Sequence, residues 1–143
     1  MADLLVNIDV DDLERGVDFY VRGLGLKPGR SLGEAAREIL GASSPIYLLE
    51  NRAGTAPYAG SVSTRDYGRH WTPVHLDLVV EDIEAAVVRA VSAGGKLEGE
   101  IANRVWGRLA RMSDPFGHGI CLLQFQGRGY DEIAGATDEA NRS

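Results

Sequence analysis

The stretch Ile8–Glu14, with the sequence IDVDDLE, returns 70 positions later as Leu78–Glu84, with the sequence LVVEDIE. A second stretch, Ile46–Glu50 (IYLLE), returns 74 positions later as Ile120–Gln124 (ICLLQ). Two pairs at nearly the same offset indicate two half-length copies of one supersecondary unit. The repeat therefore restricts both the fold and the positions at which a ligand could bind.

Composition and charge narrow the class of protein. The chain has 143 residues, 44% of them hydrophobic and 25% charged, which is typical of a globular protein. Each half alone would be only marginally stable, so we expect the halves to share a core or to depend on a second copy. The net charge of −6 and the scattered Lys and Arg argue against nucleic acid or anionic membrane as a partner, because both need a basic face. Acidity weakly favours cationic small ligands.

The sequence carries no sign of export or of a membrane span. No apolar run approaches the roughly 18 residues that a spanning helix needs, and the first residues lack a basic segment followed by an apolar run. The single cysteine, Cys121, excludes an internal disulfide and fits a reducing compartment. We therefore expect a cytoplasmic protein.

Each copy begins with a strand and a helix. Residues 4–10 alternate between apolar and polar side chains, which is the period of a strand, and apolar residues recur at helical spacing over 13–24. Residues 75–80 and 83–91 repeat the same strand and helix. The pattern predicts that the two copies start in the same way.

The middle of each copy is ambiguous on local propensity. Residues 33–40 (GEAAREIL) favour a helix by composition, but the 74-residue offset places them on residues 107–114 (GRLARMSD), with glycine and arginine in register. We predict strands at both places, because position in the repeat can override a weak propensity. The apolar runs that follow the turns at 43–45 and 114–117 are predicted as the last strands.

These predictions divide the chain into parts of one structural domain. The expected parts are a first βαβββ unit over residues 1–50, a connection over 51–72, a second βαβββ unit over 73–126 and a C-terminal tail over 127–143. We expect the end of the tail, from residue 134, to be frayed.

The doubled βαβββ order resembles a known superfamily. Val-x-Asp-Leu-Glu follows the first strand and Asp-Pro-x-Gly precedes the last one, and with the repeat they resemble the glyoxalase, bleomycin resistance and extradiol dioxygenase (vicinal oxygen chelate) proteins over residues 4–126. The resemblance implies an α+β fold in which two curved half-barrel sheets surround a cavity, with helices outside.

The resemblance also implies four positions for a divalent metal, and they fall on Leu5, Tyr47, His75 and Cys121. Only His75 is an ordinary ligand here, because leucine cannot ligate, neutral tyrosine is a poor ligand and cysteine prefers a softer ion such as zinc. Glu50 is predicted on the opposite strand face from Tyr47. We therefore expect no cofactor; if a metal does bind, its ligands would be His75, Cys121 and Tyr47.

Without a metal, the cavity itself becomes the candidate site. Strand alternation predicts an apolar wall with a few polar groups, which is typical of a small-molecule site. The residues that we assign to ligand binding are Leu5, Asn7, Asp9, Tyr47, Leu49, Trp106, Cys121 and Leu123. Asp9 either faces a cationic ligand or is solvated at the rim.

Several of these residues have a structural interpretation as well. His75 and Asp77 are either a catalytic pair or an ordinary hydrogen-bonded histidine with its neighbour. Cys121 is either a ligand or a small core residue, and Tyr47 could fill the cavity with its hydroxyl bonded to a partner such as His75. Trp106 either packs or forms a flat wall for a ring-bearing ligand. His118, directly after the Asp-Pro-Phe-Gly turn, is expected to be exposed rather than catalytic, although near a cavity mouth it could contact a ligand.

Three functions remain open at this point. The first is a metal-free protein, similar to the bleomycin resistance branch, that binds a small cationic or aromatic compound. The second is a lyase, isomerase or dioxygenase-like enzyme that uses His75, with or without a metal, on a small carbonyl or aromatic compound. The third is a structural or interaction module. For each we expect a homodimer, because open half-barrels leave sheet edges that need pairing, and the connection could allow exchanged halves.

Overall fold

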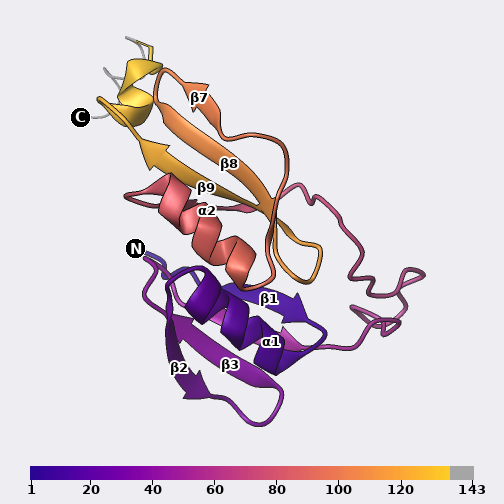
Figure 1. Ribbon diagram of the computed structural model, residues 1–143. Helices are drawn as coiled ribbons and strands as arrows, with labels where there is room; N and C mark the ends of the chain where they lie inside the picture. The colour runs from indigo at the N-terminus through magenta and orange to yellow at the C-terminus, as the bar shows by residue number, and fades with distance from the viewer. Residues whose placement is uncertain (136–143) are drawn as a thin grey trace.

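The computed structural model describes residues 1–135, which form two βαβββ units beside each other (Figure 1). The first unit contains β1 (Val6–Val10), α1 (Leu13–Asp18), a π-helical turn (Phe19–Gly23), β2 (Lys27–Ser31), β3 (Ala36–Leu40) and β4 (Ile46–Glu50). The second contains β5 (Leu76–Val79), α2 (Ile83–Ser92), β6 (Lys96–Leu97), β7 (Ala102–Arg104), β8 (Gly107–Ser113) and β9 (Gly119–Phe125). A 3₁₀ turn over Gly129–Glu132 follows.

Each unit forms its own sheet. The strand order is β1-β4-β3-β2 in the first sheet and β5-β9-β8-β6 in the second, where β7 also pairs with β8. β1 and β4 are parallel with Val6 beside Ile46, and β5 and β9 are parallel with Leu76 beside Ile120. These paired positions are related by the offsets of 70 and 74 residues found in the sequence. The repeat is therefore preserved down to strand register.

The doubtful segments in the middle of each unit are strands. β3 and β8 confirm the predicted strands over residues 36–40 and 107–113, because both hydrogen-bond along the last strand of their unit, whereas residues 33–35 form a bend. In the second unit the strand that corresponds to β2 is divided into two short ones, β6 and β7, which both pair with β8. The α+β class and the doubled order are confirmed, and both sheets are open rather than closed into a barrel.

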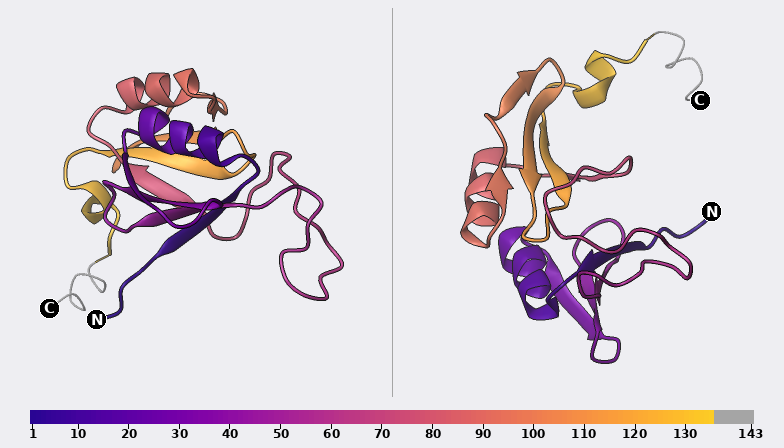
Figure 2. Two further views of the ribbon diagram at one scale, coloured as in Figure 1. Left: turned by 90° about the horizontal axis from the view of Figure 1, so that it is seen from below. Right: turned by 90° about the vertical axis from the view of Figure 1, so that its right-hand side faces the viewer.

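The main core lies between the sheets and the helices. Both helices lie on the same side of the molecule, and the sheets lie on the other (Figure 2). The largest fully buried side chains of this core are Val10, Phe19, Tyr20, Ile39, Leu48, Ile83, Met112, Phe116 and Leu122. None of the helices in the described part of the chain is long and apolar enough to cross a membrane. The prediction of a frayed end from residue 134 falls mostly on residues 136–143, which lie outside the described residues.

The last strand of each unit holds the helix of that unit in the same way. A carboxylate oxygen of Glu50 accepts a hydrogen bond from the backbone N–H of Leu13 at 2.8 Å. The amide oxygen of Gln124 accepts one from the N–H of Ile83, also at 2.8 Å. These contacts confirm that Glu50 points to the helix side, opposite to Tyr47, and is therefore used for fold rather than for a ligand.

A buried tyrosine joins the two units. Tyr20, in the π-helical turn, is fully buried and donates its hydroxyl to Oδ2 of Asp114 at 2.8 Å. Oδ1 of Asp114 accepts from the N–H groups of Phe116 at 2.8 Å and His118 at 2.9 Å. Burial, reinforced by the Asp114 charge, raises the pKa of Tyr20 well above its usual value, so the hydroxyl stays a donor.

We expect Tyr20→Phe to lower the free energy of unfolding by about 1–3 kcal/mol, because it removes a donor from a buried carboxylate. Urea denaturation of the variant and the parent protein measures the difference. Tyr58→Phe is the matched control, since Tyr58 is exposed and should be neutral. Equal stability of the Tyr20 variant and the parent would show that the hydroxyl does not hold the units together.

Candidate ligand-binding site

The predicted site residues lie on the sheet faces that point away from the helices. Val6, Ile8 and Val10 pack with the core, so Asn7 and Asp9 point to the other side of β1. The corresponding face of the second sheet carries His75, Asp77, Cys121 and Leu123 by the same alternation, and Tyr47 and Leu49 are in the first sheet. Leu5 precedes β1 and is 53% exposed.

A cavity of about 440 Å³ lies between the two sheet edges, β1 and β5. It brings together Asn7, Asp9 and His75 from the predicted set. The other lining residues are Val6, Ile8, Tyr20, His70, Thr72, Val74, Leu76, His118, Gly119 and Ile120. The predicted residues that do not line this cavity are Leu5, Tyr47, Leu49, Asp77, Trp106, Cys121 and Leu123.

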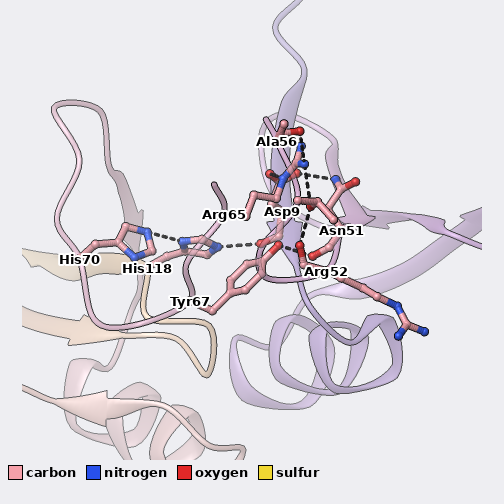
Figure 3. Close-up of polar contacts among 9 residues, drawn as sticks. Asp9, Asn51, Arg52, Ala56, Arg65, Tyr67, His70 and His118 are labelled. Carbon is pink, nitrogen blue, oxygen red and sulfur yellow. Dashed lines mark hydrogen bonds and ion pairs between the residues drawn. The ribbon is translucent and has the colours of Figure 1, made fainter. Parts of the chain in front are cut away.

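Two histidines at the cavity were not assigned to it from the sequence. Nε2 of His118 lies 2.7 Å from the backbone oxygen of Asp9, and Nδ1 of His118 lies 2.7 Å from Nε2 of His70 (Figure 3). Nδ1 of His70 lies 2.8 Å from the oxygen of Gly68. His118 is not an exposed turn residue, because the Asp114 turn directs its ring into the space between the units, where it lines the cavity as the alternative prediction allowed.

The two rings form one continuous chain of contacts. A backbone oxygen lies against the outer nitrogen of each ring, and the inner nitrogens face each other. The chain runs from Gly68 in the connection to Asp9 on β1, and it therefore joins these two segments through the turn before β9.

The carboxylate of Asp9 is already neutralised by protein groups. Its Oδ2 accepts from Nε of Arg65 at 2.8 Å, and its Oδ1 accepts from the amide of Asn51 at 2.9 Å (Figure 3). Arg65 and Asn51 belong to the connection between the units, whose Tyr67 hydroxyl also donates to the Asn51 oxygen at 2.6 Å. The charge of Asp9 thus holds the connection and is not free to attract a cationic ligand.

Tyr47 has a partner other than the one expected. Its hydroxyl donates to Oε2 of Glu38 at 3.0 Å and not to His75. Glu38 is buried and also binds the Arg30 guanidinium, with Nη2 at 2.7 Å from Oε2. Hydrogen bonds from the side chain and backbone of Arg30 lower the pKa of Glu38 to about 2. Tyr47 is therefore part of a polar network on the first sheet.

His75, Asp77 and Cys121 are neighbours on the second sheet. Nε2 of His75 lies 3.2 Å from Oδ1 of Asp77, and Asp77 is directly beside Cys121 in the parallel pair of β5 and β9. The ring of Trp71 lies against that of His75, with centroids 4.6 Å apart. Burial, followed by the charge of Asp77 and a hydrogen bond with it, raises the pKa of the Cys121 thiol to about 11.

The four family positions do not fit a divalent metal. Leu5 has no donor atom, and the Tyr47 hydroxyl is held by Glu38. His75 and Cys121 remain, which are fewer than the three protein ligands that such sites usually need. These four positions therefore do not supply a complete ligand set.

Trp106 lies outside the cavity and packs with other rings. Its ring centroid is 5.1 Å from that of Tyr130 and 6.1 Å from that of Phe125. Phe125 ends β9, whereas the cavity is at the Gly119 start of the same strand. Trp106 therefore belongs to an aromatic cluster at the opposite end of the second sheet.

A larger groove of about 1370 Å³ runs beside α1, on the helix side of the first unit. Charged side chains of both signs dominate its lining, among them Asp11, Glu14, Arg22, Arg37 and Arg52. The lining of this groove is more polar than that of the cavity between β1 and β5, whereas small-molecule sites are usually lined mostly by apolar side chains. The smaller cavity between β1 and β5 is therefore the better candidate.

We expect Cys121 of the metal-free protein to react slowly with iodoacetamide at pH 7.5, because its thiol is buried and protonated there. The rate should rise by about tenfold per pH unit toward pH 11, as the thiolate fraction rises. Mass spectrometry of the alkylated protein measures the rate, and protein unfolded in urea is the control for an ordinary thiol. Rapid labelling of the folded protein at neutral pH would contradict this assignment.

Comparison with known proteins places this geometry in a family. Residues 5–123 match the family model described as a glyoxalase-like domain. The chain is 32% identical over 133 residues to the anthracycline biosynthesis protein DnrV of Streptomyces peucetius, covering 91% of this chain but only 43% of that protein. It is 31% identical over 121 residues to the uncharacterized protein Mb0911c of Mycobacterium bovis, covering 80% of this chain and 78% of that protein.

Solved structures agree with this assignment. TnmS3, an antibiotic binding protein from Streptomyces sp. CB03234, superposes with a TM-score of 0.60 at 26% identity, over 88% of this chain and 97% of that one. A glyoxalase/bleomycin resistance protein/dioxygenase family enzyme from Burkholderia phytofirmans PsJN gives 0.67 at 20% identity, over 87% and 100%, and shows the shared fold alone. The chain belongs to the glyoxalase-like family.

Proposed function

We propose that this protein binds a small, ring-bearing organic compound in the cavity between β1 and β5, and that binding needs no metal ion. The observation that carries the proposal is the cavity itself. Its volume of about 440 Å³ lies within the range of roughly 300–1,000 Å³ that is common for small-molecule sites.

The lining of the cavity suits such a ligand. Val6, Ile8, Val74, Leu76 and Ile120 supply apolar surface for a ring system. The cavity also presents an amide, a hydroxyl and an imidazole, from Asn7, Thr72 and His75, and these groups could orient a polar substituent.

The polar contacts around the cavity do not favour a cationic ligand. The carboxylate of Asp9 is paired with Arg65 and also accepts a hydrogen bond from Asn51. A cationic compound, which the net acidity of the chain had suggested, would meet no free carboxylate among the residues that line this cavity.

The relatives support the ligand class. DnrV is named for anthracycline biosynthesis, and TnmS3 is described as an antibiotic binding protein. The chain spans less than half of DnrV, so that relative's activity as a whole is not transferred. DnrV resembles this chain in sequence and TnmS3 resembles it in fold, and the names of both associate them with antibiotic compounds.

Thermal shift and tryptophan fluorescence with a library of planar aromatic compounds test the proposal on chelator-treated protein. We expect at least one phenolic or quinone-bearing compound to raise the melting temperature and to quench Trp71, which lies against His75. His75→Ala should weaken that compound's binding by about tenfold, or ~1.4 kcal/mol.

Val88→Ala is the matched control, because Val88 is exposed on α2, on the helix side of the molecule. Its affinity should equal that of the parent protein. Equal affinity of the parent and His75→Ala would show that His75 does not contact the ligand. If none of the compounds in the library stabilises the protein, the proposed binding function is contradicted.

An enzymatic function is the second candidate, and one contact favours it. Nε2 of His75 is 3.2 Å from the carboxylate of Asp77, so Asp77 could orient the ring for proton transfer to or from a carbonyl or hydroxyl compound. Chromatography of the compounds found in the binding screen distinguishes the two functions. Product formation that His75→Ala abolishes while binding persists would establish catalysis.

We also propose that the protein is a homodimer and works in the cytoplasm, the latter supported by its single, free cysteine. Apolar side chains near the cavity and on the open sheet face are exposed, among them Leu4, Leu5, Val74 and Val79. A second copy covering this face would remove them from water. The connection over 51–72 could allow the halves to be exchanged between copies.

Light scattering should give about twice the chain mass of 15.4 kDa. Val79→Glu should shift the protein toward the monomer, because it puts a charge on the face that we expect to be covered. Val88→Glu, on the exposed surface of α2, is the matched control and should leave the mass unchanged. A monomeric parent protein at working concentration would contradict the dimer.

A further inference from the structure

The second sheet gathers three different metal-binding groups at one point. His75 directly precedes β5, Asp77 follows it on the same face, and Cys121 is beside Asp77 on β9. Their donor atoms, an imidazole nitrogen, a carboxylate oxygen and the thiol sulfur, all lie within 4.8 Å of one another. No other group of three such residues is found in the part of the chain that the structure describes.

We propose that His75, Asp77 and Cys121 form a binding site for a zinc-like ion, with the fourth coordination position open. Nitrogen, oxygen and sulfur donors together suit Zn²⁺ or Co²⁺, whereas Mg²⁺ and Ca²⁺ prefer oxygen donors only. With metal–ligand bonds of about 2.0–2.3 Å, tetrahedral ligand atoms are about 3.3–3.8 Å apart. Nε2 of His75 and Oδ1 of Asp77, 3.2 Å apart, are already near this spacing, and the Cys121 sulfur lies within 4.8 Å of the other two donors.

This donor set differs from the four positions that the family resemblance implied. Those positions draw ligands from both units, whereas the proposed site lies within one sheet and replaces Leu5 and Tyr47 by Asp77. The strand geometry makes this replacement natural, because residues two apart on a strand point to the same face. Asp77 therefore accompanies His75 without any change in the fold.

The surroundings favour an ion that can enter from solvent. Cys121 is only 5% exposed, but the side chains of His75 and Asp77 are 34% and 38% exposed, which leaves an open side. Trp71 lies against the His75 ring and limits its rotation. One nearby positive charge disfavours a bound cation: Arg111, on β8, pairs with Cys121 of β9. Its guanidinium lies 3.7 Å from the carboxylate of Glu98, which partly offsets that charge.

Cobalt titration of tag-free, chelator-treated protein tests the site by a readout that does not depend on ligand binding. We expect one Co²⁺ per chain, with a near-ultraviolet charge-transfer band from the thiolate and visible bands of tetrahedral intensity, both displaced by Zn²⁺. Cys121→Ser should remove the charge-transfer band. Asp77→Asn should weaken Co²⁺ binding by at least tenfold.

Tyr47→Phe is the matched control, since Tyr47 belongs to the family positions but not to the proposed set. Its spectrum and affinity should be those of the parent, and circular dichroism verifies that each variant is folded. The proposal is wrong if the parent shows no charge-transfer band, or if folded Cys121→Ser and Asp77→Asn bind Co²⁺ as the parent does. Loss of Co²⁺ in Tyr47→Phe would also overturn it. Because the ligand screen uses metal-free protein, failure here leaves the proposed function standing.

Discussion

The buried carboxylate of Asp114 is the point on which the arrangement of the two units depends. It accepts from the Tyr20 hydroxyl of the first unit and from two backbone N–H groups of its own turn. A buried charge with fewer partners would be costly, so these three donors are needed together. They hold the π-helical turn of one unit against the turn before β9 of the other, and thereby define the space between β1 and β5.

The same turn also determines where the histidines lie. Its fixed backbone directs His118 toward the Asp9 oxygen, and His118 in turn meets His70 from the connection. Together with Arg65 on the Asp9 carboxylate, these contacts fasten the long connection to the first unit. The cavity wall is thus built from both units and from the segment between them, although each unit contributes only a few polar groups.

Equivalent positions of the two units make the same contacts where they serve the fold, but carry different functional groups on the sheet faces that point away from the helices. Asp12 and Asp82 cap the two helices, and Glu50 and Gln124 bind the helix starts in the same way. Those positions serve the fold, so a change would cost stability in either unit. Tyr47 and Cys121, in contrast, stand at equivalent places with different partners, Glu38 and Asp77. The first sheet therefore carries a hydrogen-bonded network at this position, and the second carries groups that can ligate a metal ion.

The sequence by itself determined the doubled βαβββ order, because each ambiguous segment has an equivalent in the other copy with which it can be compared. The repeat predicts a strand within residues 33–40 against their helical propensity, and the backbone pairing of β3 confirms it over residues 36–40. Strand alternation also determined which side chains point away from the helices, including Asn7, His75 and Asp77, and it placed Glu50 on the helix side.

Only the tertiary structure decided which of these side chains meet. The partner of Tyr47, the pairing of Asp9 with Arg65, and the position of His118 depend on how the units and the connection pack. Several of these contacts join residues far apart in the chain, and neither the hydrophobic periodicity nor the repeat offset indicates which such residues lie close together. The repeat relates equivalent positions within each unit, whereas the cavity lies between the units, where the two copies are not equivalent.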